Sequence, residues 1–214
     1  MTLYEQYRPT SFDQVLGQDK AVKTLTRLSS KGLQGRAYWI SGASGTGKTT
    51  IARIIASLVA DDFCISEYDS ADSLTVSELD TIDQTQGIYG MGSKRGRAYI
   101  INESHGLRAQ TVRRLLGLLE RIPSHVVWIF TTTKEGETKL FEDQIDASPL
   151  LSRCISIALT NQGLNKVFAQ HCQAIAQTEN LDGKPLAAYE TLGKRCKNNC
   201  RMMLQEIEAG AMID

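Results

Sequence analysis

The glycine-rich segment 42–49 constrains this chain more than any other stretch of its sequence. It reads Gly-Ala-Ser-Gly-Thr-Gly-Lys-Thr and matches the phosphate-binding pattern G-x-x-x-x-G-K-T. The fixed positions of the pattern are Gly42, Gly47, Lys48 and Thr49. The apolar run 37–40 precedes the segment, and residues 50–59 behind it carry apolar side chains at helical spacing. Strand, glycine-rich loop and helix in this order predict a P-loop that binds a nucleotide.

Each residue type in the loop has a chemical reason. Glycines allow positive φ angles, so that the backbone N–H groups turn inward onto phosphate oxygens. The helix that starts near Lys48 adds the positive end of its dipole. Lys48 is expected to reach the β- and γ-phosphates, and the hydroxyl of Thr49 to bind Mg²⁺. The predicted phosphate-binding residues are Gly42, Ala43, Ser44, Gly45, Thr46, Gly47, Lys48, Thr49 and Thr50.

The composition is that of an ordinary globular protein. The 24 basic residues balance the 24 acidic ones, so any contact with DNA must come from a local patch. No apolar run approaches the roughly 20 residues of a membrane span, which argues against a membrane protein. Five irregularly spaced cysteines indicate free thiols in a reducing compartment, and we predict a cytoplasmic protein.

Apolar runs and helical patterns alternate over the first 160 residues. The expected strands are 37–40, 63–68, 98–101, 126–130 and 155–157, and the expected helices between them are 19–30, 50–59, a helix through Val76–Ile82 capped by Asp72 and Ser73, and 107–122. Residues 1–17 are expected to be irregular. This alternation predicts an α/β fold with a parallel sheet covered on both faces. Three helices, 164–177, 185–195 and 199–211, then predict a small C-terminal lobe, with domains 1–160 and 161–214.

Polar residues follow several of the predicted strands. Asn102 and Glu103 come after the strand 98–101, and Thr131, Thr132 and Thr133 come after the next strand. Ligands of parallel sheets bind at the carboxyl ends of the strands, where the P-loop also lies. We therefore expect these residues to converge on the nucleotide.

Several of these motifs together resemble the AAA+ ATPase subunits of DNA polymerase clamp loaders. The chain is similar above all to the bacterial gamma/tau motor subunit, and also to the small subunits of replication factor C. The resemblance covers nearly the whole chain and rests on Tyr7-Arg8-Pro9, the P-loop, the segment 99–105, the three threonines, Ser152-Arg153-Cys154 and Arg201. It implies ATP and Mg²⁺ as cofactors and a three-helix lid domain after the AAA+ sheet.

The resemblance also implies roles for individual residues. Tyr7, Arg8, Pro9 and Val15 would line the adenine pocket. Glu103 would orient the attacking water, and Thr133, or Thr132, would act as sensor 1. Arg153 resembles an arginine finger that serves the nucleotide of a neighbouring subunit, and Arg201 resembles sensor 2. The implied partners are other clamp-loader subunits, the sliding clamp and primed DNA.

Three departures from the family stand out. The Walker B aspartate is replaced by Asn102, which keeps one acceptor oxygen for the metal but loses a negative charge. We expect nucleotide binding to survive and magnesium affinity or turnover to fall. The cysteine cluster that binds zinc in the bacterial motor subunit is missing, since only Cys64 lies nearby. The family continues beyond the position of Asp214 into a helical collar, so we expect weak self-assembly of this chain.

Other interpretations stay open at this stage. With Asn102, the chain could be a nucleotide-binding structural subunit that does not turn over, or a different AAA+ replication motor. His171, Cys172, Cys196 and Cys200 could hold zinc in the lobe. The basic residues Lys94, Arg95, Arg97, Arg108, Arg113 and Arg114 could contact DNA phosphates.

Overall fold

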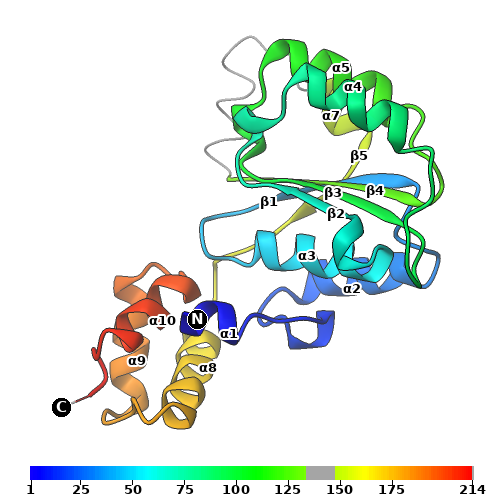
Figure 1. Ribbon diagram of the computed structural model, residues 1–214. Coiled ribbons are helices and arrows are strands. Elements are labelled where there is room, and N and C mark those ends of the chain that lie inside the picture. Colours follow the sequence, from blue (N-terminus) through cyan, green and yellow to red (C-terminus); the bar gives the residue numbers. More distant parts are fainter. Residues whose placement is uncertain (134–147, 214) are drawn as a thin grey trace.

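The computed structural model describes residues 1–133 and 148–213 (Figure 1). Five parallel strands form one sheet in the order β2-β3-β4-β1-β5. The strands are β1 (Arg36–Ser41), β2 (Ile65–Tyr68), β3 (Arg97–Ile101), β4 (Val126–Thr132) and β5 (Cys154–Ala158). The α/β fold with a parallel sheet that the sequence predicts is thus confirmed.

Helices cover both faces of this sheet and form the C-terminal lobe. The α-helices are α1 (Leu3–Gln6), α2 (Asp19–Ser29), α3 (Lys48–Val59), α4 (Val76–Thr85), α5 (Ala109–Leu119), α7 (Ser148–Ser152), α8 (Asn165–Thr178), α9 (Leu186–Arg195) and α10 (Cys200–Glu208). Short 3₁₀ helices are η1 (Phe12–Gln14), η2 (Asp62–Cys64), η3 (Ala71–Ser73) and η4 (Ser104–Gly106). None of the described helices is long and apolar enough to cross a membrane.

The two faces of the sheet carry different side chains because successive strand residues point to opposite sides. Trp39, Trp128 and Phe130 point toward α4, α5 and α7, where Tyr99 stacks on Trp128 at 4.5 Å between ring centroids. The opposite face is mainly aliphatic, apart from Tyr38, and packs on α2 and α3. All residues of β4 are buried, as expected for a central strand covered on both sides (Figure 1).

Some local expectations are wrong. Asp72 and Ser73 do not cap α4, because they lie in or beside η3; the cap is Thr75. The Thr75 hydroxyl accepts from the Glu78 amide, and the Glu78 carboxylate accepts from the Thr75 amide, which is a reciprocal capping box. The N-terminal segment is not irregular throughout, since it contains α1 and η1.

The N-terminal segment packs on the helical lobe. Leu3, with Tyr4, Tyr7 and Leu16, joins the apolar cluster formed by α8, α9 and α10. Figure 1 shows α1 beside α8 and α10, below the sheet. The first residues of the chain and the last helices therefore build one unit next to the P-loop. The boundary near residue 160 stays a prediction; β5 ends at Ala158 and α8 begins at Asn165.

Candidate nucleotide site

The P-loop leaves the carboxyl end of β1 and enters α3 at Lys48. Gly45 and Gly47 have φ angles of 75° and 96°, a region that side chains with a Cβ rarely adopt. The Lys48 ammonium is buried and donates to the carbonyl oxygens of Gly42 at 3.1 Å and Ala43 at 3.0 Å. The loop therefore has the left-handed glycine turn and the inward lysine that phosphate binding requires.

The ends of three parallel strands meet at Asn102. Its Oδ1 accepts from the hydroxyl of Thr49 at 3.3 Å and from that of Thr131 at 2.9 Å. Its Nδ2 donates to Oε1 of Glu67 at 2.8 Å. The structure thus joins the two residues predicted to hold the metal, Thr49 and Asn102, and adds Thr131, which the sequence analysis did not single out for a role.

These oxygens suit a magnesium ion by type but not by charge. Mg²⁺ takes oxygen ligands, and the Thr49 hydroxyl and the Asn102 carbonyl oxygen are both oxygen donors. Both groups are neutral, however, so the charge that balances the ion must come from nucleotide phosphates and from nearby carboxylates.

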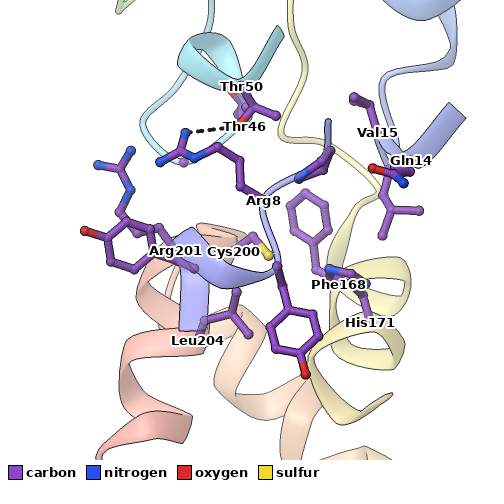
Figure 2. Close-up of a pocket in the computed structure, with 16 residues that line it drawn as sticks. Arg8, Gln14, Val15, Thr46, Thr50, Phe168, His171, Cys200, Arg201 and Leu204 are labelled. Carbon is purple, nitrogen blue, oxygen red and sulfur yellow. Dashed lines mark hydrogen bonds between the residues drawn. The ribbon is translucent and has the colours of Figure 1, made fainter. Parts of the chain in front are cut away.

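A pocket lies between the P-loop, the N-terminal segment and the lobe, as Figure 2 shows. It is lined by all four residues expected around the adenine, Tyr7, Arg8, Pro9 and Val15. From the P-loop and α3 it takes Gly45, Thr46, Gly47 and Thr50. Arg201 of α10 completes the set of predicted residues at this pocket. The sequence motifs at both ends of the chain therefore meet at one place.

Seven further lining residues carry no motif. They are Tyr4, Gln14, Leu16, Phe168, His171, Cys200 and Leu204. Figure 2 shows Phe168 and His171 projecting from α8 toward the segment that holds Val15. Burial lowers the pKa of His171, so its imidazole is neutral at pH 7 and suits an uncharged base. Helical spacing predicts which lobe residues are buried, but not which of them face the P-loop.

The N-terminal segment is held against the pocket by polar contacts. Arg8 donates to the hydroxyl of Thr50 at 3.3 Å, as the dashed line in Figure 2 marks, and it also pairs with Glu5 at 2.5 Å. The Tyr7 hydroxyl donates to Glu179, at the end of α8, at 2.6 Å, and this contact raises the pKa of Tyr7. The arm thus connects the P-loop helix to the lobe.

The segment that leads into α10 adopts a left-handed backbone conformation without glycine. Lys197 and Asn198 have φ angles of 52° and 56°, and asparagine tolerates this left-handed region better than most residues. Asn199 caps α10 by accepting from the Met202 amide at 3.2 Å. A Cβ on Gly45 would lie 2.0 Å from Oδ1 of Asn199, so the lobe packs directly on the P-loop.

Solved structures of RuvB from Thermotoga maritima share this architecture. One RuvB mutant superimposes with a TM-score of 0.74 at 22% identity, covering 95% of this chain and 65% of that chain. The branch migration motor itself gives a TM-score of 0.67. The chain has the AAA+ fold.

Curated relatives agree with this fold and with the resemblance found in the motifs. The gamma/tau subunit of DNA polymerase III from Mycoplasma pneumoniae is 28% identical over 199 residues, which cover 84% of this chain and 28% of that protein. The gamma/tau subunit from Mycoplasma genitalium is 31% identical over 175 residues, 72% of this chain and 28% of that protein. The chain thus spans less than a third of the length of these relatives. No family model matches it.

Within the AAA+ fold, Glu103 follows β3 as predicted, but its carboxylate does not contact the P-loop. Its φ angle is 49°, its side chain is 48% exposed, and Oε2 lies 3.4 Å from Nδ1 of His105. The same ring nitrogen lies 3.4 Å from the Thr132 hydroxyl. Thr133, the main sensor 1 candidate, comes directly after β4 and is the last described residue before segment 134–147.

Arg153 lies at the amino ends of the strands, whereas the P-loop of its own chain lies at their carboxyl ends. It precedes β5, whose first residue Cys154 pairs with Ala37 near the start of β1. Strand residues advance about 3.3 Å each, so roughly 15 Å or more separates Arg153 from the P-loop beyond Ser41. Its guanidinium donates to the Pro149 carbonyl oxygen at 2.8 Å and to the Glu120 carboxylate.

The basic residues do not form one patch. Arg97 begins β3 and Arg108 follows η4 at the other end of that strand. Arg114 is paired with Asp80 and Asp83, each at 2.7 Å, and the Arg95 guanidinium lies over the Tyr89 ring. Arg108 and Arg113 are exposed.

For zinc, the described residues contain no cluster of three potential ligands, and the lobe cysteines are free thiols.

Proposed function

We propose that this chain is an ATP-binding and ATP-hydrolysing subunit of the clamp-loader type that acts in DNA replication. The observation that carries this proposal is the convergence of Thr49, Asn102 and Thr131 in one hydrogen-bonded group at the carboxyl ends of the strands. Sequence similarity to gamma/tau subunits supports the replication role.

The residues divide the work as follows in this proposal. The P-loop amides and Lys48 bind the phosphates, while the pocket around Tyr7 and Val15 takes the adenine. Thr49 and Asn102 hold Mg²⁺, which when bound offsets charge on the phosphates. Glu103 orients the attacking water, for which its carboxylate leaves His105, and Thr133 completes the site as sensor 1. Arg201 links the lobe to the nucleotide.

Arg153 acts on the nucleotide of a neighbouring subunit in this proposal. Its position at the amino ends of the strands, away from the P-loop of its own chain, supports action in trans. An arginine finger supplied in trans stabilises charge on the transferred phosphoryl group and accelerates hydrolysis by about 10³–10⁵. Hydrolysis would therefore require assembly with other AAA+ subunits.

A protein partner such as the sliding clamp fits the loop 86–96. This loop is held on the end of α3, since the Asp61 carboxylate accepts from Ser93 and from the Lys94 amide. Large apolar side chains are nevertheless exposed on it and beside it, namely Phe63, Ile88, Tyr89 and Met91. Large exposed apolar side chains on an ordered loop are typical of a protein contact. Primed DNA is the further partner, with Arg108 and Arg113 as phosphate contacts.

ATP turnover as a function of protein concentration tests this proposal. We would measure steady-state hydrolysis with Mg²⁺ and primed DNA for the natural chain, Glu103→Gln and Arg153→Ala. Turnover per chain should rise with concentration and fall by about 10³-fold or more in Arg153→Ala. Mixing Arg153→Ala with Glu103→Gln should restore activity. The Glu103→Gln subunit supplies its Arg153 to the site of the Arg153→Ala subunit, which keeps Glu103. Turnover independent of concentration and of Arg153 would refute the action in trans.

A second candidate is a nucleotide-holding subunit that does not turn over. It is favoured by the neutral Asn102 and by the contact of Glu103 with His105. Tight ATP binding without hydrolysis under all these conditions would support it. Asn102→Asp should then restore turnover if the missing charge is the cause. Another AAA+ replication motor is the remaining alternative; the similarity to RuvB, at 22% identity, concerns the fold alone.

A further inference from the structure

The amide of Asn102 is held in one orientation by three partners. Oδ1 accepts from two hydroxyls, those of Thr49 and Thr131, and Nδ2 donates to the carboxylate of Glu67. A carboxylate only accepts, so the NH₂ group must face Glu67 and the carbonyl oxygen must face Thr49. Glu67 therefore aims the one acceptor of Asn102 toward the position of the metal.

Glu67 is also the carboxylate that is hydrogen-bonded directly to Asn102. Thr49, Thr131 and Asn102 are all neutral, and the next member of the chain of contacts is the Glu67 carboxylate at 2.8 Å from Nδ2. Its side chain is 20% exposed, so water screens it only in part. Its charge is shared with Arg53 of α3, whose Nε donates to Oε2 of Glu67 at 2.8 Å.

We propose that Glu67 is a positioning residue of the magnesium site and supplies the negative charge that Asn102 lacks. It fixes the amide with the carbonyl oxygen toward the ion, and its carboxylate balances the ion from the far side of the amide. This inference rests on the proposed binding of ATP and Mg²⁺. It deepens that function by assigning a residue on β2, outside every motif of the sequence.

The test is the magnesium dependence of nucleotide affinity, measured without hydrolysis. We would titrate each protein with fluorescent ADP at a series of free Mg²⁺ concentrations and with EDTA. Glu67→Gln should bind ADP in EDTA as tightly as the natural chain, but should need about tenfold more Mg²⁺ for the half-maximal increase in affinity. Mn²⁺ in place of Mg²⁺, followed by electron paramagnetic resonance, measures the same loss directly.

Arg53→Met separates a role at the metal from a structural role. Both variants break the ion pair between α3 and β2, so a purely structural effect would be the same in both. If Glu67 acts through its charge, Arg53→Met should lower the Mg²⁺ requirement, because it removes a positive charge from the same carboxylate. Opposite signs for Glu67→Gln and Arg53→Met are the expected result.

Moving the negative charge from position 67 to position 102 should rescue the Glu67→Gln variant. Asn102→Asp in the Glu67→Gln background returns one negative charge to the same pair and should restore the Mg²⁺ requirement to within about threefold of the natural value. Thermal melting of each variant identifies any that do not fold.

Three results would overturn the inference in distinguishable ways. ADP binding with a magnesium dependence that Glu67→Gln leaves unchanged would refute the role of Glu67 alone. Absence of nucleotide binding by the natural chain, with or without Mg²⁺, would refute the proposed function and this inference with it. Equal losses in Glu67→Gln and Arg53→Met would reduce Glu67 to a structural ion pair.

Discussion

The sheet and the helical lobe bury their apolar residues in different ways. Each central strand is covered on two faces, and β4 is buried along its whole length between two helical layers. The lobe has a single apolar cluster, to which α8, α9 and α10 each contribute one face. The sheet is therefore covered mainly by the helices of its own layers, with Phe12 and Val15 only partly buried against it, whereas the lobe fully buries Leu3 from the start of the chain.

This difference explains where the pocket lies. The sheet fixes the P-loop, and the lobe with α1 closes the pocket from the other side (Figure 1). Gln18 joins the two parts, because its buried amide donates to the carbonyl oxygens of Thr46 and Thr160 and accepts from the Thr160 amide. The Gln18 side chain is thus hydrogen-bonded both to a P-loop residue and to the start of the link to the lobe.

The largest expected effects on the free energy of unfolding come from variants that each remove a buried ring from one of the two cores. Trp128→Ala removes a fully buried ring that stacks on Tyr99, and Tyr189→Ala removes the fully buried ring at the centre of the lobe. Each should lower the free energy of unfolding of its own part by about 3–5 kcal/mol. Urea denaturation followed by tryptophan fluorescence reports on the sheet, which holds both tryptophans, and circular dichroism reports on all helices.

Tyr189→Ala should shift part of the circular dichroism transition to lower urea and leave the fluorescence transition nearly in place. Phe63→Ala, at an exposed site, is the control and should change neither by more than about 0.5 kcal/mol. If both probes move together in Tyr189→Ala, the sheet and lobe unfold as one unit, and the predicted boundary near residue 160 does not separate folding domains.

A smaller effect tests the contact between the two parts. Gly45→Ala forces a side chain into a left-handed backbone, at a cost of about 1–2 kcal/mol. Its Cβ would also displace Asn199 from the P-loop. We therefore expect weaker ADP binding by fluorescence titration, partly restored by adding Asn199→Ala.

Gly117→Ala is the matched control for this change. Apart from the neighbouring residues and backbone of its own helix, no atom of the described residues lies within 4 Å of a Cβ at Gly117, which sits inside α5. Alanine should therefore stabilise the helix by about 0.5–1 kcal/mol. It should leave ADP affinity unchanged. Unaltered ADP binding in Gly45→Ala would show that the lobe does not need its close packing on the loop.

The smallest effect concerns the surface of the sheet unit. The Arg114 guanidinium, followed by the charge of Arg121, lowers the pKa of Asp83. A lowered carboxyl pKa stabilises the fold above the pKa of the unfolded chain, near 4, and this contribution disappears as the pH falls through the folded value. Asp83→Asn should therefore cost about 0.5–1 kcal/mol at pH 7 and almost nothing near pH 2.

Urea denaturation at both pH values measures this difference. Glu208→Gln, at an exposed position at the end of α10, serves as the control and should change the free energy of unfolding by no more than about 0.5 kcal/mol. An Asp83→Asn cost that persists near pH 2 would mean that packing, not the ion pairs with α5, accounts for it.

Local patterns in the sequence predict much of this arrangement. The P-loop, the five strands and the three lobe helices follow from residue spacing, because glycine geometry and hydrophobic periodicity act over a few neighbouring residues. The expected caps of α4, Asp72 and Ser73, are the wrong residues, although the spacing of Thr75 and Glu78 is itself a local signal for a capping box. The short helix α1 shows no such pattern, and its contacts with α10 are long-range.

The sequence by itself determined the phosphate-binding loop and the parallel sheet that carries it, since both depend on short-range geometry. Only the tertiary structure decided which partners Asn102 has. Glu67 lies 35 residues before it in the chain and Thr131 lies 29 residues after it, and parallel pairing brings all three side chains together. It also placed Arg153 at the amino ends of the strands, opposite the P-loop, and the first residues of the chain against the lobe. Hydrogen bonds between strands set the neighbours of Asn102 and the position of Arg153, whereas apolar packing holds the first residues against the lobe, and no spacing along the chain encodes these contacts.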